Sequence, residues 1–160
     1  MKTLKVMAVA CAIALFAVVS GSAQQPPVYD GSMTLEQAKK AMAAAEAEAI
    51  KNNLAMVIAI VDGTGHLLML HKLDNASYGS IRVAMGKART AFEFRQPTKN
   101  LHERLNAGSA THLLTLGGAT LIEGGLPIVV GGKIVGAIGV SGGSPTQDAQ
   151  VAKAGADTVQ

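Results

Sequence analysis

A chain of 160 residues is long enough for one domain that buries its own core, without disulfides or a metal to hold it together. Aromatic residues make up 3% of the chain and Trp is absent, which excludes a surface that stacks nucleic-acid bases. Charged residues make up 16%, against roughly 25% in an average soluble domain, and the net charge is +3, so neither a disordered charged tail nor a basic nucleic-acid-binding arm is expected.

The N-terminal segment, residues 1–23, has the pattern of a secretory signal peptide. Two lysines precede an apolar run over residues 6–19, and small residues ending at Ala23 follow it. The run is shorter than the roughly 20 residues that a membrane-spanning helix needs; a retained N-terminal anchor is the alternative. We therefore predict cleavage near Ala23 and export, either to the periplasm or out of the cell.

Removing residues 1–23 would change the charge and the cysteine content. Two lysines would leave, so 12 basic and 11 acidic residues would give a net charge of +1. Cys11, the one cysteine of the sequence, would leave as well. A mature chain without cysteine excludes thiolate catalysis and cysteine-ligated metal sites, and its near-neutral charge gives no support for a nucleic-acid partner.

The mature chain is expected to begin with an extended lead-in and a helix. Residues 24–33 contain Pro and Gly and show no periodicity, so we place the start of the folded domain, residues 34–160, after them. Thr34 and Gln37 have the spacing of a capping box, and apolar residues then recur at helical spacing until Asn52.

A β-hairpin should follow this helix. Residues 54–61 are an apolar run rich in β-branched side chains, which is typical of a buried strand. A glycine-containing turn then predicts a second strand over residues 66–72. Asp62 lies inside the turn, where its carboxylate is expected to accept hydrogen bonds from backbone amides.

Helices are expected in the middle of the chain. Apolar residues at helical spacing predict a helix over residues 80–94, which Pro97 ends. Thr98 is expected to cap a short helix that ends at Leu105. Residues 106–125 are rich in Gly, Thr and Ala with weak periodicity, so we predict a loop there.

The last part of the chain predicts a second hairpin and a final helix. Strands are expected over residues 126–130 and 133–140, and two glycines in the second strand indicate that another segment lies close to its backbone. Ser144, followed by Pro and then Gln147, predicts a capped helix start. The fold class is therefore α+β: a central antiparallel β-sheet of two hairpins, about five strands, flanked by helices.

Histidines are the first candidates for chemistry. No two of them stand at the spacing of a zinc site, and no two acidic residues are three apart, so no metal site is predicted. His66 and His71 lie five residues apart on one predicted strand and should point to opposite faces. One histidine per chain is still enough for an axial haem ligand; a surface or hydrogen-bonded side chain is the alternative for each. The four histidines of the mature chain are His66, His71, His102 and His112.

A glycine-rich turn before the last helix is the second candidate. Ser141, Gly142 and Gly143 could bind a carboxylate, a propionate or a phosphate through their backbone amides, with Lys87 as a countercharge. Asp148 could join this pocket or simply stabilise the start of the helix. The turn matches neither a Walker nor a dinucleotide-binding motif, and a plain strand-to-helix connection is the alternative.

Several of these segments together resemble the GlcG/HbpS family, also known as the haem-degrading or DUF336 domain and related to the C-terminal domain of PduO-type corrinoid adenosyltransferases. The resemblance covers residues 34–158 in the family's order. The matching segments are VDGTGHLL at 61–68, KLDNA at 72–76, GKARTA at 86–91, PT at 97–98, GLPI at 125–128, GAIGVSGG at 136–143, QD at 147–148 and AKAG at 152–155.

The resemblance implies an antiparallel sheet flanked by helices, and homo-oligomers. Exported family members include haem-binding proteins that feed redox sensing, and others are linked to haem breakdown. The first helix of this chain contains no histidine, so a haem ligand drawn from that helix has no counterpart here. The order in which we would test ligands is therefore His112 and His102 first, because a loop residue can reach a neighbouring subunit, and then His71 and His66.

Three functional hypotheses follow. The first is an exported haem- or tetrapyrrole-binding homo-oligomer, acting in haem sensing, sequestration or breakdown. The second is an enzyme or binding protein for a small organic acid or ring compound in the glycine-lined pocket around Lys87, Ser141 and Asp148, although no nucleophile–base pair is recognisable. The third is a ligand-independent partner of a membrane sensor.

Overall fold

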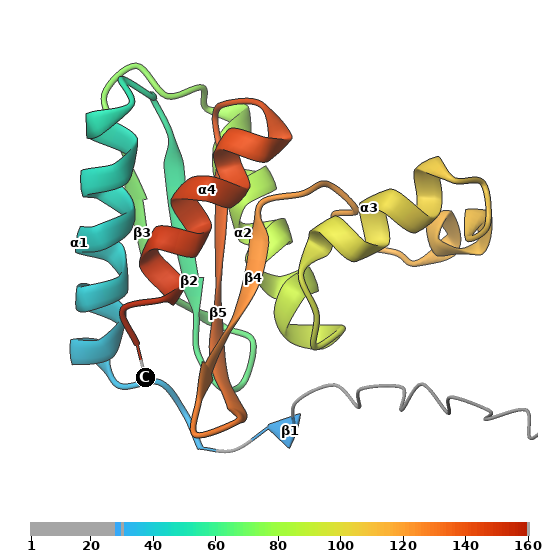
Figure 1. The fold of residues 1–160 in the computed structure, drawn as a ribbon, viewed down its shortest axis with the longest axis horizontal. Coiled ribbons are helices and arrows are strands. Elements are labelled where there is room, and N and C mark those ends of the chain that lie inside the picture. The colour runs from blue at the N-terminus through green and yellow to red at the C-terminus, as the bar shows by residue number, and fades with distance from the viewer. Residues whose placement is uncertain (1–27, 30, 160) are drawn as a thin grey trace, which may run out of the picture.

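The computed structural model describes residues 28–29 and 31–159 (Figure 1). The predicted signal peptide and its cleavage site lie outside the described residues. Among the described helices, none combines the length and the apolar character that crossing a membrane requires.

A four-stranded antiparallel sheet in the order β3-β2-β5-β4 forms the centre of the domain. A short strand in the predicted lead-in, β1, pairs in parallel with the start of β5. The two predicted hairpins, β2–β3 and β4–β5, are confirmed, as is the α+β fold class. The strands are β1 (Val28–Tyr29), β2 (Val57–Val61), β3 (Leu67–Lys72), β4 (Gly125–Val130) and β5 (Lys133–Ser141).

Helices cover both faces of this sheet (Figure 1). Helices α1 and α4 pack side by side on one face, and α2 packs on the other against β2, β4 and β5. This arrangement explains why all five residues of β2 are apolar and buried: a central strand covered on both faces has no solvent-facing side. The helices are α1 (Leu35–Lys51), α2 (Gly79–Glu93), α3 (Thr98–Asn106), the 3₁₀ helix η1 (Thr111–Thr115) and α4 (Pro145–Ala156).

The predicted helix starts at Thr34 and Ser144 are confirmed. Each side chain accepts the backbone N–H of the glutamine three residues on, and that glutamine's side chain accepts the cap's backbone N–H in return. Such reciprocal bonds satisfy two amides that the helix itself leaves unpaired.

The predicted capping role of Thr98 is wrong. Pro97 occupies the N-cap position, and Thr98 is already the first helical residue and makes no side-chain capping bond. Its hydroxyl is buried and accepts the backbone N–H of Gly125 on β4 at 2.9 Å. The side chain therefore fastens α3 to the edge of the sheet, a contact between residues 27 positions apart that helix-start patterns do not reveal.

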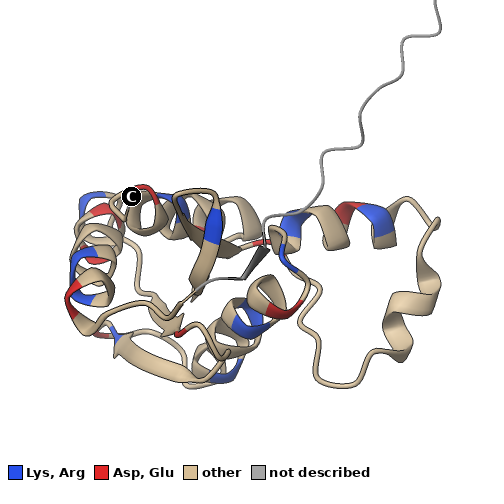
Figure 2. Ribbon diagram, turned by 90° about the horizontal axis from the view of Figure 1, so that it is seen from below, with Lys and Arg blue, Asp and Glu red and all other residues tan. Residues whose placement is uncertain are grey.

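Residues 98–124, which we call the arm, project from the sheet and its helices (Figure 1). The segment that we predicted to be a loop contains η1, and Leu113 packs with Leu101 and Ala110 in a small core of its own. Between residues 105 and 122 the arm carries no Lys, Arg, Asp or Glu, and its far end is accordingly tan throughout in Figure 2.

The predicted close approach to β5 is confirmed at Gly139. A Cβ atom added there would overlap the backbone of Ala84 and Ala88 on α2. Glycine at this position lets α2 lie directly on the sheet. Because α2 lies this close to the sheet, the directions of its side chains are fixed on both sides of the helix.

Candidate functional site

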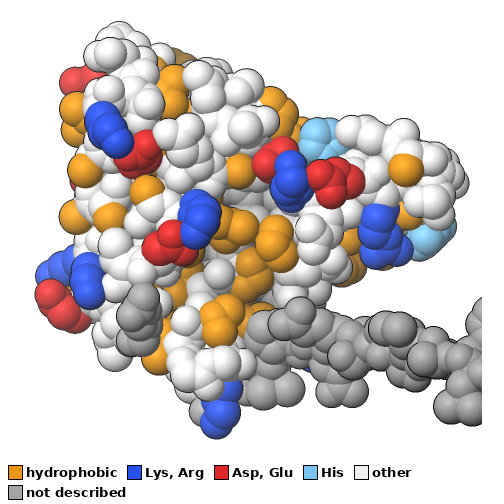
Figure 3. Space-filling model, viewed as in Figure 1, with side chains coloured by type: hydrophobic (Ala, Val, Ile, Leu, Met, Phe, Trp, Pro, Cys, Tyr) orange, Lys and Arg blue, Asp and Glu red, His pale blue; other side chains and the backbone are white. Residues whose placement is uncertain are grey.

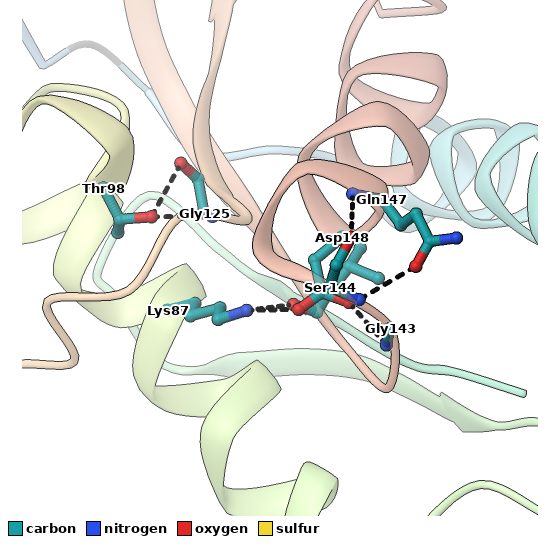
Figure 4. A network of polar contacts seen from close by, with 8 residues as sticks. Lys87, Thr98, Gly125, Gly143, Ser144, Gln147 and Asp148 are labelled. Carbon is teal, nitrogen blue, oxygen red and sulfur yellow. Dashed lines mark hydrogen bonds and ion pairs between the residues drawn. The ribbon is translucent and has the colours of Figure 1, made fainter. Parts of the chain in front are cut away.

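Polar groups from five segments meet at one end of the sheet (Figure 4). Lys87 reaches the meeting point from α2, Thr98 from α3, Asp148 from α4, and Gly125 and Gly143 contribute backbone groups from β4 and the β5–α4 turn. We call this cluster the polar junction. Five of the segments that carry the family resemblance, those at 86–91, 97–98, 125–128, 136–143 and 147–148, are thus brought together in space.

An ion pair lies at the centre of the polar junction. The Lys87 Nζ atom is 2.6 Å from Asp148 Oδ2 and donates a second hydrogen bond to the Val140 carbonyl at 2.9 Å. The side chains of Lys87 and Asp148 are 0% and 4% exposed. Burial lowers the pKa of Lys87 and raises the pKa of Asp148, and the attraction between the two groups opposes both shifts.

The glycine-rich turn predicted to bind an anion contacts the chain's own carboxylate. Gly143 N–H donates to the second Asp148 oxygen, Oδ1, at 2.9 Å, and Ser141 is buried at the end of β5. Binding of an external anion by Lys87, Gly142 and Gly143 stays a prediction, and such an anion would have to compete with Asp148 for these donors.

The start of β4 covers the polar junction. A Cβ atom at Gly124 would lie 2.8 Å from Lys87 Nζ and 2.7 Å from Asp148 Cβ, and Gly124 has a φ of +123°. Glycine is therefore required there for both space and backbone conformation. The two glycines before Leu126 close the ion pair off from the surface.

A cavity of about 460 Å³ lies on the outer side of those glycines. Figure 3 shows hydrophobic side chains gathered in this hollow between the body and the arm, with oppositely charged side chains on both rims. We call it the arm cavity. Its lining includes Pro97 directly before the arm, Lys99 and Glu123 of the arm, Leu126 of β4, and Gln150 and Lys153 of α4.

The four histidines are not brought together. His71 Nδ1 lies 2.6 Å from Glu46 Oε1 on α1, whereas His66 lies beside α2, so the two do face opposite sides of the sheet as predicted. His102 is half-buried on α3, and His112 is exposed on η1. Among the described residues, no group of three or more His, Cys, Asp or Glu side chains could hold a metal ion.

His66 lines a second cavity, of about 310 Å³, which we call the histidine cavity. Leu67 and Met85 also line it and are 47% and 36% exposed, so both present apolar surface at the cavity. Arg89 of α2 lies in the same wall. The cavity thus combines a ring nitrogen, a guanidinium group and exposed apolar surface.

A chain of hydrogen bonds orients the His66 ring. Thr64 Oγ1 lies 2.6 Å from Asp62 Oδ1 and 2.9 Å from His66 Nδ1. Asp62 also accepts the backbone N–H groups of Thr64 and His66, which confirms its predicted role in the turn. The hydrogen bond from the Thr64 hydroxyl is the main cause that lowers the pKa of Asp62, and the backbone bonds add to it.

This chain of contacts determines the tautomer of neutral His66. The ionised Asp62 can only accept, so the single hydroxyl proton of Thr64 is donated to it. Thr64 Oγ1 then accepts from His66, which places the ring proton on Nδ1. The Nε2 atom of the neutral ring consequently carries a lone pair.

Comparison with known proteins identifies the family of this chain. The family model described as "Haem degrading protein HbpS-like" matches residues 33–157. The chain belongs to this HbpS-like family. The protein GlcG of Escherichia coli strain K12 is 44% identical over 109 residues, which cover 68% of this chain and 81% of GlcG.

Solved structures of HbpS-like proteins have the same fold. The crystal structure of HbpS is 35% identical with a TM-score of 0.76, and the match covers 83% of this chain and 94% of that one. A crystal structure of a PduOC:haem complex is 25% identical with a TM-score of 0.73, covering 80% of this chain and 95% of that one.

Some residues of these sites escape sequence reasoning. Arg89 and Met85 lie within the helix predicted over residues 80–94, and no motif ties them to His66. Lys99 and Lys153 look like ordinary surface lysines, because the cavity between them forms only when the arm and α4 meet. One signal was available for Thr98. A threonine directly after the proline at a helix start can use its hydroxyl in two ways, as a bond within that helix start or as a bond to another segment.

Proposed function

We propose that this HbpS-like protein binds haem or a similar tetrapyrrole, with His66 as the axial ligand. The observation that carries the proposal is the Asp62–Thr64–His66 chain, which leaves Nε2 of a neutral ring free at a cavity wall. Metal-binding histidines usually donate their other ring N–H to a nearby oxygen in this way, which fixes the ring and its tautomer. The family description and the haem complex of PduOC support the same ligand.

The other groups of the histidine cavity fit such a ligand. Leu67 and Met85 offer apolar surface to a porphyrin face. The Nε atom of Arg89 is 2.6 Å from Glu93 Oε1, in a pair whose side chains are 65% and 44% exposed. Exposed pairs of this kind are weak, and the guanidinium has further donors for a propionate.

The size of the histidine cavity limits how much of a tetrapyrrole it can cover. Its volume of about 310 Å³ is at the lower end of the range of about 300–1,000 Å³ for small-molecule sites. Residues outside the cavity, including those of a second copy of the chain, would therefore cover the rest of a tetrapyrrole. Bound haem would supply an iron centre that takes an imidazole nitrogen, and its porphyrin ring absorbs strongly in the Soret region.

Haemin titration of the purified protein tests the proposal. A saturable Soret shift at one haem per chain or per pair of chains is expected, and His66→Ala should remove it. The variants His71→Ala, His102→Ala and His112→Ala are matched controls, since each removes one imidazole from another surface. Loss of the shift in His102→Ala or His112→Ala, with His66→Ala unchanged, would reject His66 as the ligand.

We also propose that the protein forms a homo-oligomer through the arm. Leu114, Leu116 and Ile122 are 68%, 36% and 42% exposed on a segment without charged residues, and such apolar surface favours contact with another chain. Leu114→Ser should lower the mass measured by light scattering. Ile50→Ser is the control, because Ile50 is 66% exposed on α1, away from the arm.

Export, and a role in haem sensing or breakdown, stay part of the proposal. The signal-like pattern of residues 1–23 supports export, and a mature protein that begins after Ala23 in a non-cytoplasmic fraction would establish it. Incubation of the haem complex with a reductant and dioxygen separates the roles: loss of the Soret band with release of iron means breakdown, and a stable band means sensing or sequestration. Partner capture that needs no haem would instead favour the ligand-independent partner of a membrane sensor.

A further inference from the structure

The arm cavity offers a second binding site, independent of the histidine cavity. Among the described residues, the two cavities share no lining residue: the histidine cavity lies beside the β2–β3 turn, α2 and Gly118 of the arm, and the arm cavity lies between the base of the arm, β4 and α4. We propose that the arm cavity binds a small organic carboxylate with a compact apolar body.

Two lysines from different elements give the cavity its charge. Lys99 stands on the arm and Lys153 on α4, and with Glu123 they are the ionisable side chains of the lining, so the lining has a net charge of +1. An ammonium group on each of two walls attracts a carboxylate from both sides. Asn100 and Gln150 add amide groups that can hydrogen-bond a second polar group of the ligand.

The present partners of both lysines are exchangeable. Lys153 Nζ lies near the Asp157 carboxylate at 2.5 Å, and Lys99 Nζ lies 3.3 Å from Glu103 Oε1. Asp157 and Glu103 are 60% and 63% exposed, and ion pairs at such exposed positions contribute little. A ligand carboxylate held over an apolar floor can therefore take their place, because less water competes for the ammonium groups there.

The ion pair of Lys99 with Glu123 differs from these exposed pairs and is expected to remain when a ligand binds. Its Nζ lies 3.2 Å from Oε1 of Glu123, whose side chain is only 12% exposed. This contact holds the ammonium group at the cavity wall whether or not a ligand is bound. Lys99 is thus oriented in advance, whereas Lys153 is free to turn toward the ligand.

The floor and walls fit a compact ligand better than an extended peptide. Pro97, Leu126 and Ala149 form apolar lining, and the volume of about 460 Å³ is within the usual range of about 300–1,000 Å³ for small-molecule sites. At the edge of β4 that faces away from β5, the Gly125 N–H is already bound by Thr98, and Pro127 has no N–H to offer. The first half of this edge therefore offers no free N–H group to a peptide strand.

Calorimetric titration of the purified protein with benzoate, succinate and malonate tests this site. Saturable binding of at least one of them is expected at constant ionic strength, with no comparable response to chloride or sulfate. Lys99→Met and Lys153→Met should each raise the Kd about tenfold, because each removes a charged hydrogen-bond donor. Comparison of benzoate with the two diacids shows whether one or both lysines hold a carboxylate.

Two controls make the outcome decisive. Lys51→Met removes another exposed lysine, from α1, far from the cavity in sequence and outside its lining, and should leave the Kd unchanged. His66→Ala should also leave it unchanged, so that failure of haem binding and failure of carboxylate binding are told apart. Equal binding by wild type, Lys99→Met and Lys153→Met, or a response to chloride and sulfate as strong as to the carboxylates, would overturn the proposal.

Discussion

The polar junction and the histidine cavity lie on the two sides of α2 and differ in whether their polar groups are fully hydrogen-bonded. Lys87 in the junction is fully buried, and its ammonium group is satisfied by the Asp148 carboxylate and the Val140 carbonyl. His66 in the cavity is exposed, and its ring is oriented through one nitrogen only. A buried network that is complete stabilises the fold, whereas an oriented group with a free lone pair is prepared for a ligand.

The largest effect is expected from breaking the junction. Asp148→Ala would leave the Lys87 ammonium buried without its partner, which should lower the free energy of unfolding by about 3–5 kcal/mol. Urea denaturation measures this loss. His66→Ala is the matched change on the other side of α2 and should cost less than about 0.5 kcal/mol, as is usual for an exposed side chain.

A double variant separates the contribution of the ion pair to stability from that of side-chain packing. Lys87→Met with Asp148→Leu replaces the ion pair by apolar side chains, which for buried pairs is often neutral or stabilising. We expect it to recover most of the stability lost in Asp148→Ala. A double variant as unstable as the single one would mean that the junction depends on the Gly143 N–H···Asp148 bond and not on the ion pair.

The fold was predictable where its causes are local. The helix starts at Thr34 and Ser144 and both hairpins follow from neighbouring residues, since capping and turn formation act over three or four positions. The contact of Lys87 with Asp148 spans 61 positions, and nothing in the spacing indicates that the glycine-rich turn would bind this carboxylate. The ranking of the histidines likewise required the structure, because the orientation of His66 and the lining of its cavity depend on how α2 lies on the sheet.

The position of α2 is shared by both regions, so moving it should disturb both. Gly139→Ala would push a methyl group into the backbone of α2 at Ala84 and Ala88, and such overpacking costs about 1–3 kcal/mol. Thermal unfolding measures the cost. Gly117→Ala is the control, because a Cβ atom there meets nothing within 4 Å. Equal melting temperatures for the two variants would show that α2 does not need this close approach.

Thr64→Val should affect only the histidine cavity. It removes the hydroxyl that links Asp62 to His66, and loss of such an outer partner typically weakens metal binding about 10–100-fold. Haemin affinity should fall by that factor while the free energy of unfolding changes little. Unchanged haemin affinity in Thr64→Val would mean that the orientation of the ring through Nδ1 does not matter.

The smallest effect is expected in the free energy of unfolding at acidic pH. The folded-state pKa of Asp62 lies below its ordinary value of 3.8, mainly because of the Thr64 hydroxyl bond. Its contribution is therefore fully present above about pH 3.8 and is lost as the pH falls through the folded-state pKa. Asp62→Asn should flatten the stability profile below that pH, as measured by urea denaturation at a series of pH values. If the free energy of unfolding of the variant fell with acidic pH in the same way as that of the wild type, this linkage would be contradicted.

One measurement tests the contrast between the two sides of α2 most directly: haemin titration of His66→Ala beside the Lys87→Met, Asp148→Leu double variant. The structure predicts that the first variant loses the saturable Soret shift and that the second retains it with the affinity of the wild type. A shift retained in His66→Ala and lost in the folded double variant would place the ligand at the polar junction and contradict the division of roles.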